Sequence, residues 1–98
     1  MIVIVGHARI KPEAREAAIA AATEMQRLSS AEDGCQEYGF WFAVDDPDAM
    51  LLFERWDDLA ALERHRLEPH FAEFGSRIGE FVAGPVEMLR YSAEPGEF

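Results

Sequence analysis

The residues that could carry out chemistry are concentrated between positions 54 and 71. This stretch contains Glu54 and Trp56, followed by His65 and His70. An imidazole, with an ordinary pKa of about 6.5, can accept a proton at neutral pH. A carboxylate can do the same when its surroundings raise its pKa. The pattern predicts general-base chemistry, with His65, His70 and Glu54 as the candidate catalytic residues.

Both histidines also have structural interpretations. His65 could hydrogen-bond a backbone carbonyl and fix a break between two helices, and this interpretation is as well supported as catalysis. His70 follows Pro69 at an expected helix N-terminus, where the dipole disfavours the charged imidazole and leaves it able to accept a proton. For His70 we favour a structural role beside Pro69.

Glu54 shares one face of an expected strand with Leu52 and Trp56, because successive side chains of a strand alternate. A carboxylate on an inward face needs a partner, or its pKa rises. Glu54 could act as a base or orient a histidine, but we favour a salt bridge with Arg90 or Arg9. Trp56 offers an aromatic wall with an N–H donor, although core packing is its favoured role.

Other residues are candidate walls of a pocket. Tyr38 could donate a hydrogen bond to a substrate oxygen, and several phenylalanines could line an apolar cavity or form a small core. The candidate substrate-binding residues are His7, Tyr38, Leu52, Trp56, Phe71 and Phe74.

Metal and thiol chemistry have little support in the sequence. A metal site would have to combine the three histidines with Glu54, and the histidines do not follow the i, i+4 spacing of one continuous helix, so we predict no metal site. Cys35 is the only cysteine, which excludes an intramolecular disulfide. No basic sequence neighbour lowers its pKa. Phosphate-binding and dinucleotide-binding glycine motifs and a GxSxG elbow are absent.

The elements that must position these residues follow the order β-α-β-β-α-β. The first strand begins as a β-branched run that is expected to be buried on both faces. The last helix begins after a cap at Asp57 or Asp58, breaks at Pro69 and stops at Gly84-Pro85. The expected strands are 2–10, 35–44, 50–56 and 86–91, the first helix is 13–29, and the turn between the middle strands is 45–48.

This order is typical of the α+β class with a ferredoxin-like split βαβ fold and a four-stranded antiparallel sheet. Two helices cover one face of such a sheet. The other face would expose Trp41 and part of the first strand, a larger apolar patch than monomers usually show. We therefore expect a homodimer with its sheets packed face to face, one domain at 1–92, and a C-terminal tail at 93–98.

Charge and composition narrow the partners. The chain has 98 residues and a formal net charge of -10, so nucleic acid and membrane surfaces are poor partners. The apolar start is too short for a signal peptide, and no stretch approaches a membrane span. A soluble cytoplasmic protein is expected.

An ordered set of short motifs covers about residues 2–91. The set consists of Gly34-Cys35, Tyr38, Phe53-Glu54-Arg55-Trp56, Leu62, His65, Pro69-His70-Phe71, Gly84-Pro85 and Tyr91. It resembles the antibiotic biosynthesis monooxygenase (ABM) domain, including its quinol monooxygenase-like members. The resemblance implies a dimeric α+β barrel with a pocket between helices and sheet in each subunit. It also implies, as in the characterised oxygenases, O2 chemistry on electron-rich aromatics without flavin, haem or metal.

Departures from the family pattern limit which activities of the family can be expected for this chain. Leu52 stands where the polyketide-anthrone oxygenases have an asparagine. His7 replaces an asparagine of the haem-degrading relatives, and their haem-ligating histidine falls near Gly75, which disfavours haem degradation. The spacing of His65 and His70 is also similar to a branch that isomerises a phosphorylated autoinducer breakdown product.

The leading hypothesis is a cofactor-independent monooxygenase that oxidises a quinol or polycyclic phenol, so the expected partner is a small aromatic molecule. An isomerase or lyase acting on a small carbonyl compound is the alternative from another enzyme class. A non-catalytic dimeric module that binds a small apolar ligand is the third possibility.

Overall fold

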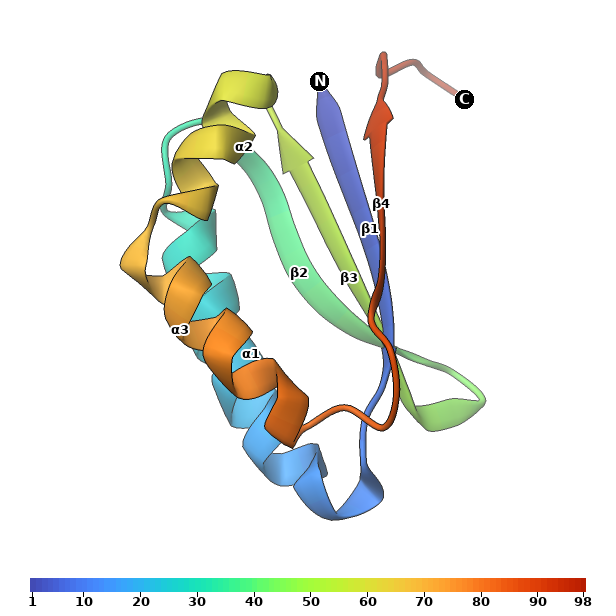
Figure 1. Cartoon of the computed structure of the whole chain (residues 1–98). Helices are drawn as coiled ribbons and strands as arrows, with labels where there is room; N and C mark the ends of the chain where they lie inside the picture. The colour runs from blue at the N-terminus through green and yellow to red at the C-terminus, as the bar shows by residue number, and fades with distance from the viewer.

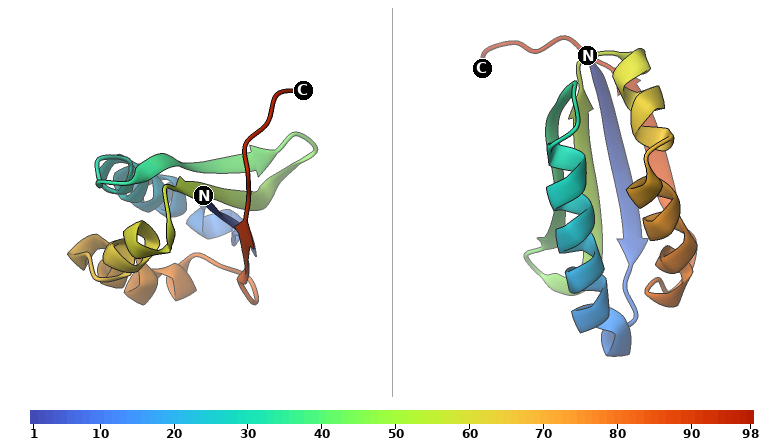
Figure 2. Two further views of the ribbon diagram at one scale, coloured as in Figure 1. Left: turned by 90° about the horizontal axis from the view of Figure 1, so that it is seen from above. Right: turned by 90° about the vertical axis from the view of Figure 1, so that its left-hand side faces the viewer.

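The computed structural model describes all residues from Met1 to Phe98 and contains a single antiparallel sheet with the strand order β2-β3-β1-β4. The strands are β1 (Ile2–Arg9), β2 (Cys35–Ala43), β3 (Asp46–Trp56) and β4 (Glu87–Ser92). The helices are α1 (Arg15–Ser30), α2 (Leu59–Arg66) and α3 (Pro69–Arg77), with short 3-10 helices η1 (Pro12–Ala14) and η2 (Ile78–Glu80). All helices lie on one face of the sheet (Figures 1 and 2). The predicted α+β split βαβ fold is confirmed.

The middle hairpin is longer than expected. Strand β3 begins at Asp46 rather than at residue 50, so Pro47 lies inside the strand and not in a turn. The cause is the register: after an irregularity between Phe42 and Ala43, Ala43 still pairs with Asp46. Only residues 44 and 45 are left to form the turn.

The broken second helix begins as expected and ends earlier. Asp58 caps α2 by accepting a hydrogen bond from the backbone N–H of Ala61 at 2.9 Å, and Pro69 starts α3. Leu59 and Arg66 of α2 are exposed. The helical stretch ends with η2, well before Gly84-Pro85. The buried residues of α2 are Ala61, Leu62 and His65. No helix of the chain has both the length and the apolar character needed to cross a membrane.

The two faces of the sheet differ as the strand alternation predicts. Tyr38 lies opposite Glu54, and Glu54 lies opposite Ile4, on the face that the helices cover. Trp41 lies on the open face and is 55% exposed. Val3 and Val5 of β1 share this open face and are only partly buried, and His7 and Arg9 on the same face are exposed. The expected burial of this strand on both faces is therefore not met within one chain.

Two groups of apolar side chains between helices and sheet form the core. One surrounds Trp56, which is fully buried, and contains Ile4, Met25 and Leu62. The other group, at the opposite end of α1, consists of Ile10, Ala18, Ala21, Met50 and Phe81. The space between these groups, under α3, contains the site described next.

Candidate functional site

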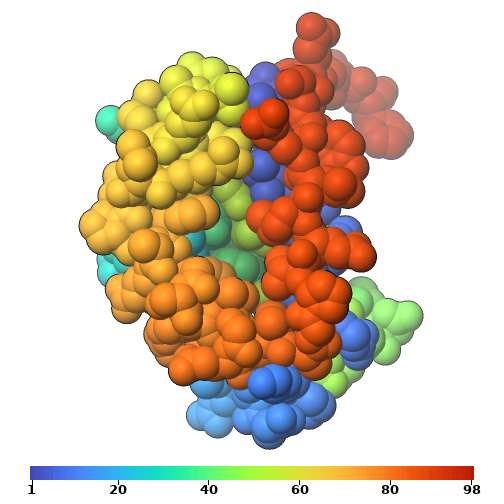
Figure 3. All heavy atoms as spheres, viewed as in Figure 1, coloured from blue at the N-terminus to red at the C-terminus, as the bar shows by residue number.

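A cavity of about 190 Å³ lies between the sheet and α3. Eleven of the fifteen residues that line it are hydrophobic, so bound molecules would meet an apolar surface. Figure 3 shows a hollow in the surface between α3, in orange, and β4, in red. The cavity is lined by Gly6, His7, Ala8, Met25, Tyr38, Phe40, Met50, Leu52, Glu54, Phe71, Phe74, Gly75, Ile78, Val86 and Met88.

The absence of a side chain at Gly6 leaves room at this cavity. A Cβ atom on Gly6 would lie 2.6 Å from Met88 Sδ and 3.3 Å from Leu52 Cβ. The first distance is shorter than real Cβ contacts and the second is tight, so an alanine would push Met88 aside. Gly6 therefore allows Met88 of strand β4 to lie across the sheet beside Leu52.

Glu54 brings a carboxylate to the apolar cavity. Its side chain is 3% exposed, and Oε1 accepts a hydrogen bond from Trp56 Nε1–H at 2.8 Å. The predicted salt bridge with Arg90 or Arg9 is wrong: Glu54 has no ion-pair partner, and Arg9 pairs with Asp46. Burial raises the pKa of Glu54 to about 7, although the Trp56 hydrogen bond opposes this rise.

Tyr38 lies directly across from Glu54 in the β2–β3 pairing and also lines the cavity. It is 6% exposed, and burial raises the pKa of its phenol. The hydroxyl therefore stays protonated at neutral pH and retains a hydrogen to donate.

The five other candidate substrate-binding residues differ in their relation to the cavity. Trp56 is fully buried and does not line the cavity, so its contribution is the hydrogen bond to Glu54. His7 borders the cavity from β1, although its register partner Leu51 places its side chain on the open face. Leu52, Phe71 and Phe74 line the cavity.

Neither His65 nor His70 lines this cavity. Both contact Glu32 instead: its Oε2 lies 2.6 Å from His65 Nδ1 and 2.8 Å from His70 Nε2. The backbone-carbonyl partner suggested for His65 is therefore wrong. The ring of His65 lies between Trp56 and Phe71, at centroid distances of 4.7 and 5.2 Å. Burial lowers the pKa of His65, with Glu32 opposing the shift, so its neutral form is favoured.

Sequence reasoning missed Glu32. This residue lies in the short segment after α1, which looks like an ordinary polar loop, and it is 33 positions from His65. Gly34 is the local feature that shapes this segment, because it adopts φ of 84° and a Cβ there would lie 2.6 Å from Ala61 Cβ. The sequence shows the glycine, but not the helix that approaches it.

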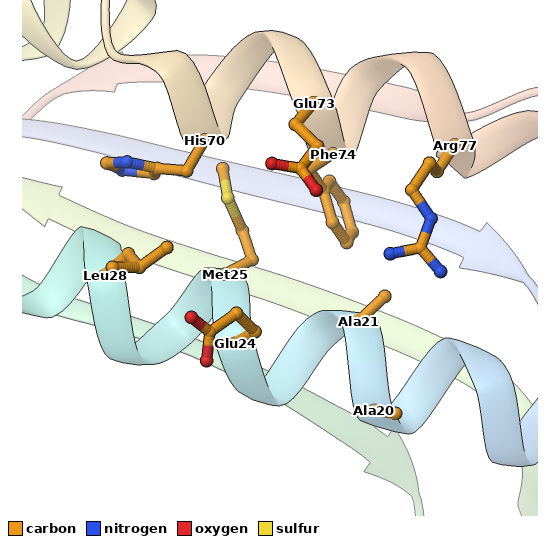
Figure 4. A pocket seen from close by; sticks show the side chains of 9 residues that line it. All are labelled: Ala20, Ala21, Glu24, Met25, Leu28, His70, Glu73, Phe74 and Arg77. Atoms are coloured by element: carbon orange, nitrogen blue, oxygen red, sulfur yellow. The ribbon is translucent and has the colours of Figure 1, made fainter.

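His70 faces a second cavity, of about 270 Å³, between α1 and α3. Figure 4 shows its imidazole beside Leu28 and Met25 of α1. Charged groups of Glu24, Glu73 and Arg77 also line this cavity, which makes it more polar than the cavity at Glu54. The histidines thus do not line the cavity at Glu54, although His65 packs against Trp56 and Tyr38, which lie next to Glu54.

The structure also bears on the thiol of Cys35 and on the metal set that the sequence suggested. Cys35 is a thiol at neutral pH, because burial raises its pKa to about 11. The metal set that combines His7 and Glu54 with the other histidines is not assembled, since His7 and Glu54 lie on opposite faces of the sheet.

Comparisons with known proteins agree on one family. The sequence profile described as Antibiotic biosynthesis monooxygenase matches residues 1–77. YcnE of Bacillus subtilis, provisionally named a monooxygenase, is 30% identical over 90 residues, which cover 92% of this chain and 95% of YcnE. An uncharacterised Synechocystis protein, sll1783, is 33% identical over 92% of this chain, and the match spans only 61% of that protein's length.

A solved structure supports the same relationship. Rv0793 of Mycobacterium tuberculosis, also provisionally named a monooxygenase, is 35% identical over 78 residues, which cover 80% of this chain and 76% of Rv0793. Its structure superposes with a TM-score of 0.89 over 97% of this chain and 96% of that chain, at 28% identity. The likeness therefore extends over nearly the whole fold.

Proposed function

Because the chain belongs to the antibiotic biosynthesis monooxygenase family, we propose that it oxidises a quinol or phenol with O2 in the cavity beneath α3. Family membership supports a general monooxygenase-like function. The substrate class and the use of this cavity are our additions, and they rest on the chemistry of the cavity walls. No flavin, haem or metal takes part in the proposed reaction.

One observation carries the proposal: a carboxylate without an ion-pair partner faces an apolar cavity. The pKa of Glu54 is raised to about 7, mainly by burial. A base whose pKa lies near the working pH is effective, because much of it is unprotonated while it still accepts protons well. We assign Glu54 as the base that removes the phenolic proton of the substrate.

The proposed reaction balances without an external reductant. The phenolate transfers one electron to O2, and the resulting radical pair recombines to form a carbon–oxygen bond. Glu54 returns its proton to this peroxide. Loss of water, formed from the outer peroxide oxygen and the hydrogen of the attacked carbon, gives a quinone from a phenol and a hydroxyquinone from a quinol. One atom of O2 ends in the quinone and the other in water.

The cavity walls fit the other demands of this chemistry. Phe71, Phe74 and Leu52 provide apolar surface that excludes water from the anion and from O2. Tyr38 carries a protonated hydroxyl that can donate to a substrate oxygen and orient the ring. These residues position the substrate, and Glu54 supplies the proton acceptor.

Cavity size indicates a small substrate. A volume of about 190 Å³ is below the roughly 300–1,000 Å³ of pockets that hold drug-sized ligands. We therefore favour a substrate with one or two rings, such as a naphthoquinol, over a polycyclic anthrone.

The direct test is O2 uptake by metal-free protein with menadiol and related one-ring and two-ring quinols. We expect uptake above the protein-free rate, and Glu54→Gln should lower it by about 100-fold or more, in keeping with the contribution of a general base. Glu63→Gln is the matched control, because Glu63 is exposed on α2 and does not line the cavity. It should retain the wild-type rate.

Two results would reject this function. Uptake equal to the protein-free rate across the panel would remove the monooxygenase assignment. Turnover of a carbonyl compound that persists without O2 would favour the isomerase or lyase alternative instead.

A further inference from the structure

A cluster of ionisable side chains outside the Glu54 cavity has no part in the proposed reaction. Glu32, His65 and His70 come from the loop after α1, from α2 and from α3. A single oxygen, Glu32 Oε2, lies within hydrogen-bond distance of one ring nitrogen of each histidine. One ligand atom from each of the three residues lies within 4.8 Å of the other two. The loop after α1 thus meets the break between α2 and α3, 33 to 38 positions further along the chain.

We propose that Glu32, His65 and His70 form a binding site for a divalent transition metal, with Zn²⁺ as the best match. Two imidazole nitrogens and one carboxylate oxygen are typical zinc ligands, and a fourth position would be left for water. Tetrahedral ligand atoms about 2.1 Å from zinc lie about 3.4 Å apart. The hydrogen-bonded contacts of 2.6 and 2.8 Å therefore need to open by less than about 1 Å.

Burial preorganises this site and leaves a route to it. The side chain of His65 is 1% exposed, and its ring is held against Trp56 and Phe71. The side chains of Glu32 and His70 are 10% and 14% exposed, so an ion can reach them from solvent. A rigid buried ligand combined with two partly exposed ones requires only small side-chain movements on binding.

Charge also favours a cation here. Glu32 forms salt-bridge contacts with the two histidines only, and no lysine or arginine neutralises its carboxylate. The chain carries a formal net charge of -10, which attracts cations generally. A metal ion would supply the positive charge that the two imidazoles, when neutral, do not.

Metal binding at this site must compete with protons. Without metal, His65 and His70 each donate a ring N–H to the Glu32 carboxylate. To bind a metal, the same nitrogens must present lone pairs, so each proton moves to the other ring nitrogen. Protons and the metal ion compete for the same lone pairs, so affinity should fall in acid.

The inference goes beyond the proposed function, because the site lies outside the Glu54 cavity and its test needs no turnover. The test is isothermal titration calorimetry of chelator-treated wild-type protein with ZnSO4 at pH 7.5. We expect one Zn²⁺ per chain. His70→Ala and Glu32→Gln should each weaken binding by about 100-fold or more, because each removes a ligand.

The chain offers matched controls for both changes. His7→Ala removes the third histidine of the chain, which lies outside the cluster, and Asp33→Asn removes an exposed charge next to Glu32. Both controls should bind Zn²⁺ like the wild type. Mg²⁺, which prefers all-oxygen octahedral sites, should not bind.

Spectroscopy gives an independent result. Co²⁺ in place of Zn²⁺ should show the intense visible absorption of a four-coordinate ion, and His70→Ala should lose it. No saturable Zn²⁺ binding by the wild-type protein would overturn the proposal, as would equal loss of affinity in His7→Ala and His70→Ala. The wild-type stoichiometry decides the question even if a variant folds poorly.

Discussion

At the scale of single residues, the decisive feature is a carboxylate whose only hydrogen-bond partner is a tryptophan. Trp56 Nε1–H donates to Glu54 Oε1 and lowers the pKa of Glu54, while burial raises it more strongly. Trp56 is thus a positioning residue: it tunes the base without reaching the cavity. Its effect should be visible in the pH dependence of catalysis.

Replacing Trp56 by phenylalanine removes this N–H donor and keeps an aromatic ring. A hydrogen bond to a charged group contributes about 1.5–3 kcal/mol, so the pKa of Glu54 should rise by about one unit or more. The midpoint of the pH–rate profile, expected near 7 in the wild type, should move upward by the same amount. A profile that keeps its midpoint would contradict this role. Trp41→Phe is the matched control on the open face and should leave the midpoint unchanged.

At the scale of elements, the turn at Gly34 places the segment that contains Glu32 against α2. Gly34 has φ of 84°, and an added Cβ would meet Ala61 Cβ at 2.6 Å. Gly34→Ala should therefore lower the free energy of unfolding by about 2 kcal/mol, from backbone strain and from the steric contact.

Urea denaturation measures this effect. Gly79→Ala is the control, because a Cβ at Gly79 has open space around it and needs no positive φ. The control should change the free energy of unfolding by less than about 0.5 kcal/mol. Equal urea midpoints for Gly34→Ala and the wild type would show that the turn tolerates a side chain.

Elements and their faces were predictable where the signal is local. The alternation of Tyr38 and Trp41 between two sheet faces follows from the period of a strand, and the break at Pro69 follows from the missing N–H of proline. The partners of Glu54 and His65 were not predictable. They depend on which segments meet in space, and the Glu32 contact spans 33 positions of sequence.

At the scale of the whole molecule, the open face of the sheet remains uncovered in one chain. Trp41, Leu89 and Tyr91 on this face are 55%, 54% and 50% exposed. Val5 and Phe53 lie between them and are only partly buried. We propose that two chains pack these faces together as a homodimer, because apolar patches of this kind mark interfaces.

A charge on this open face should disrupt the dimer. Trp41→Glu places a carboxylate where two copies would meet, on a chain that is already strongly acidic. Light scattering after size exclusion should give the mass of two chains for the wild type and of one chain for the variant. Val44→Glu, in the exposed hairpin turn, should remain dimeric. A wild-type protein with the mass of one chain would refute the homodimer.

The central claim is that Glu54 is the base of a monooxygenase reaction in the cavity beneath α3. The most direct test is the pH dependence of kcat/KM for O2-dependent quinol oxidation, because this ratio reports the pKa of the free enzyme's base. The carboxylate is the active form, so kcat/KM should rise with pH through a midpoint of about 7 in the wild type. Glu54→Gln should lower the activity by about 100-fold or more and abolish this rise. An unchanged profile in Glu54→Gln would contradict the assignment.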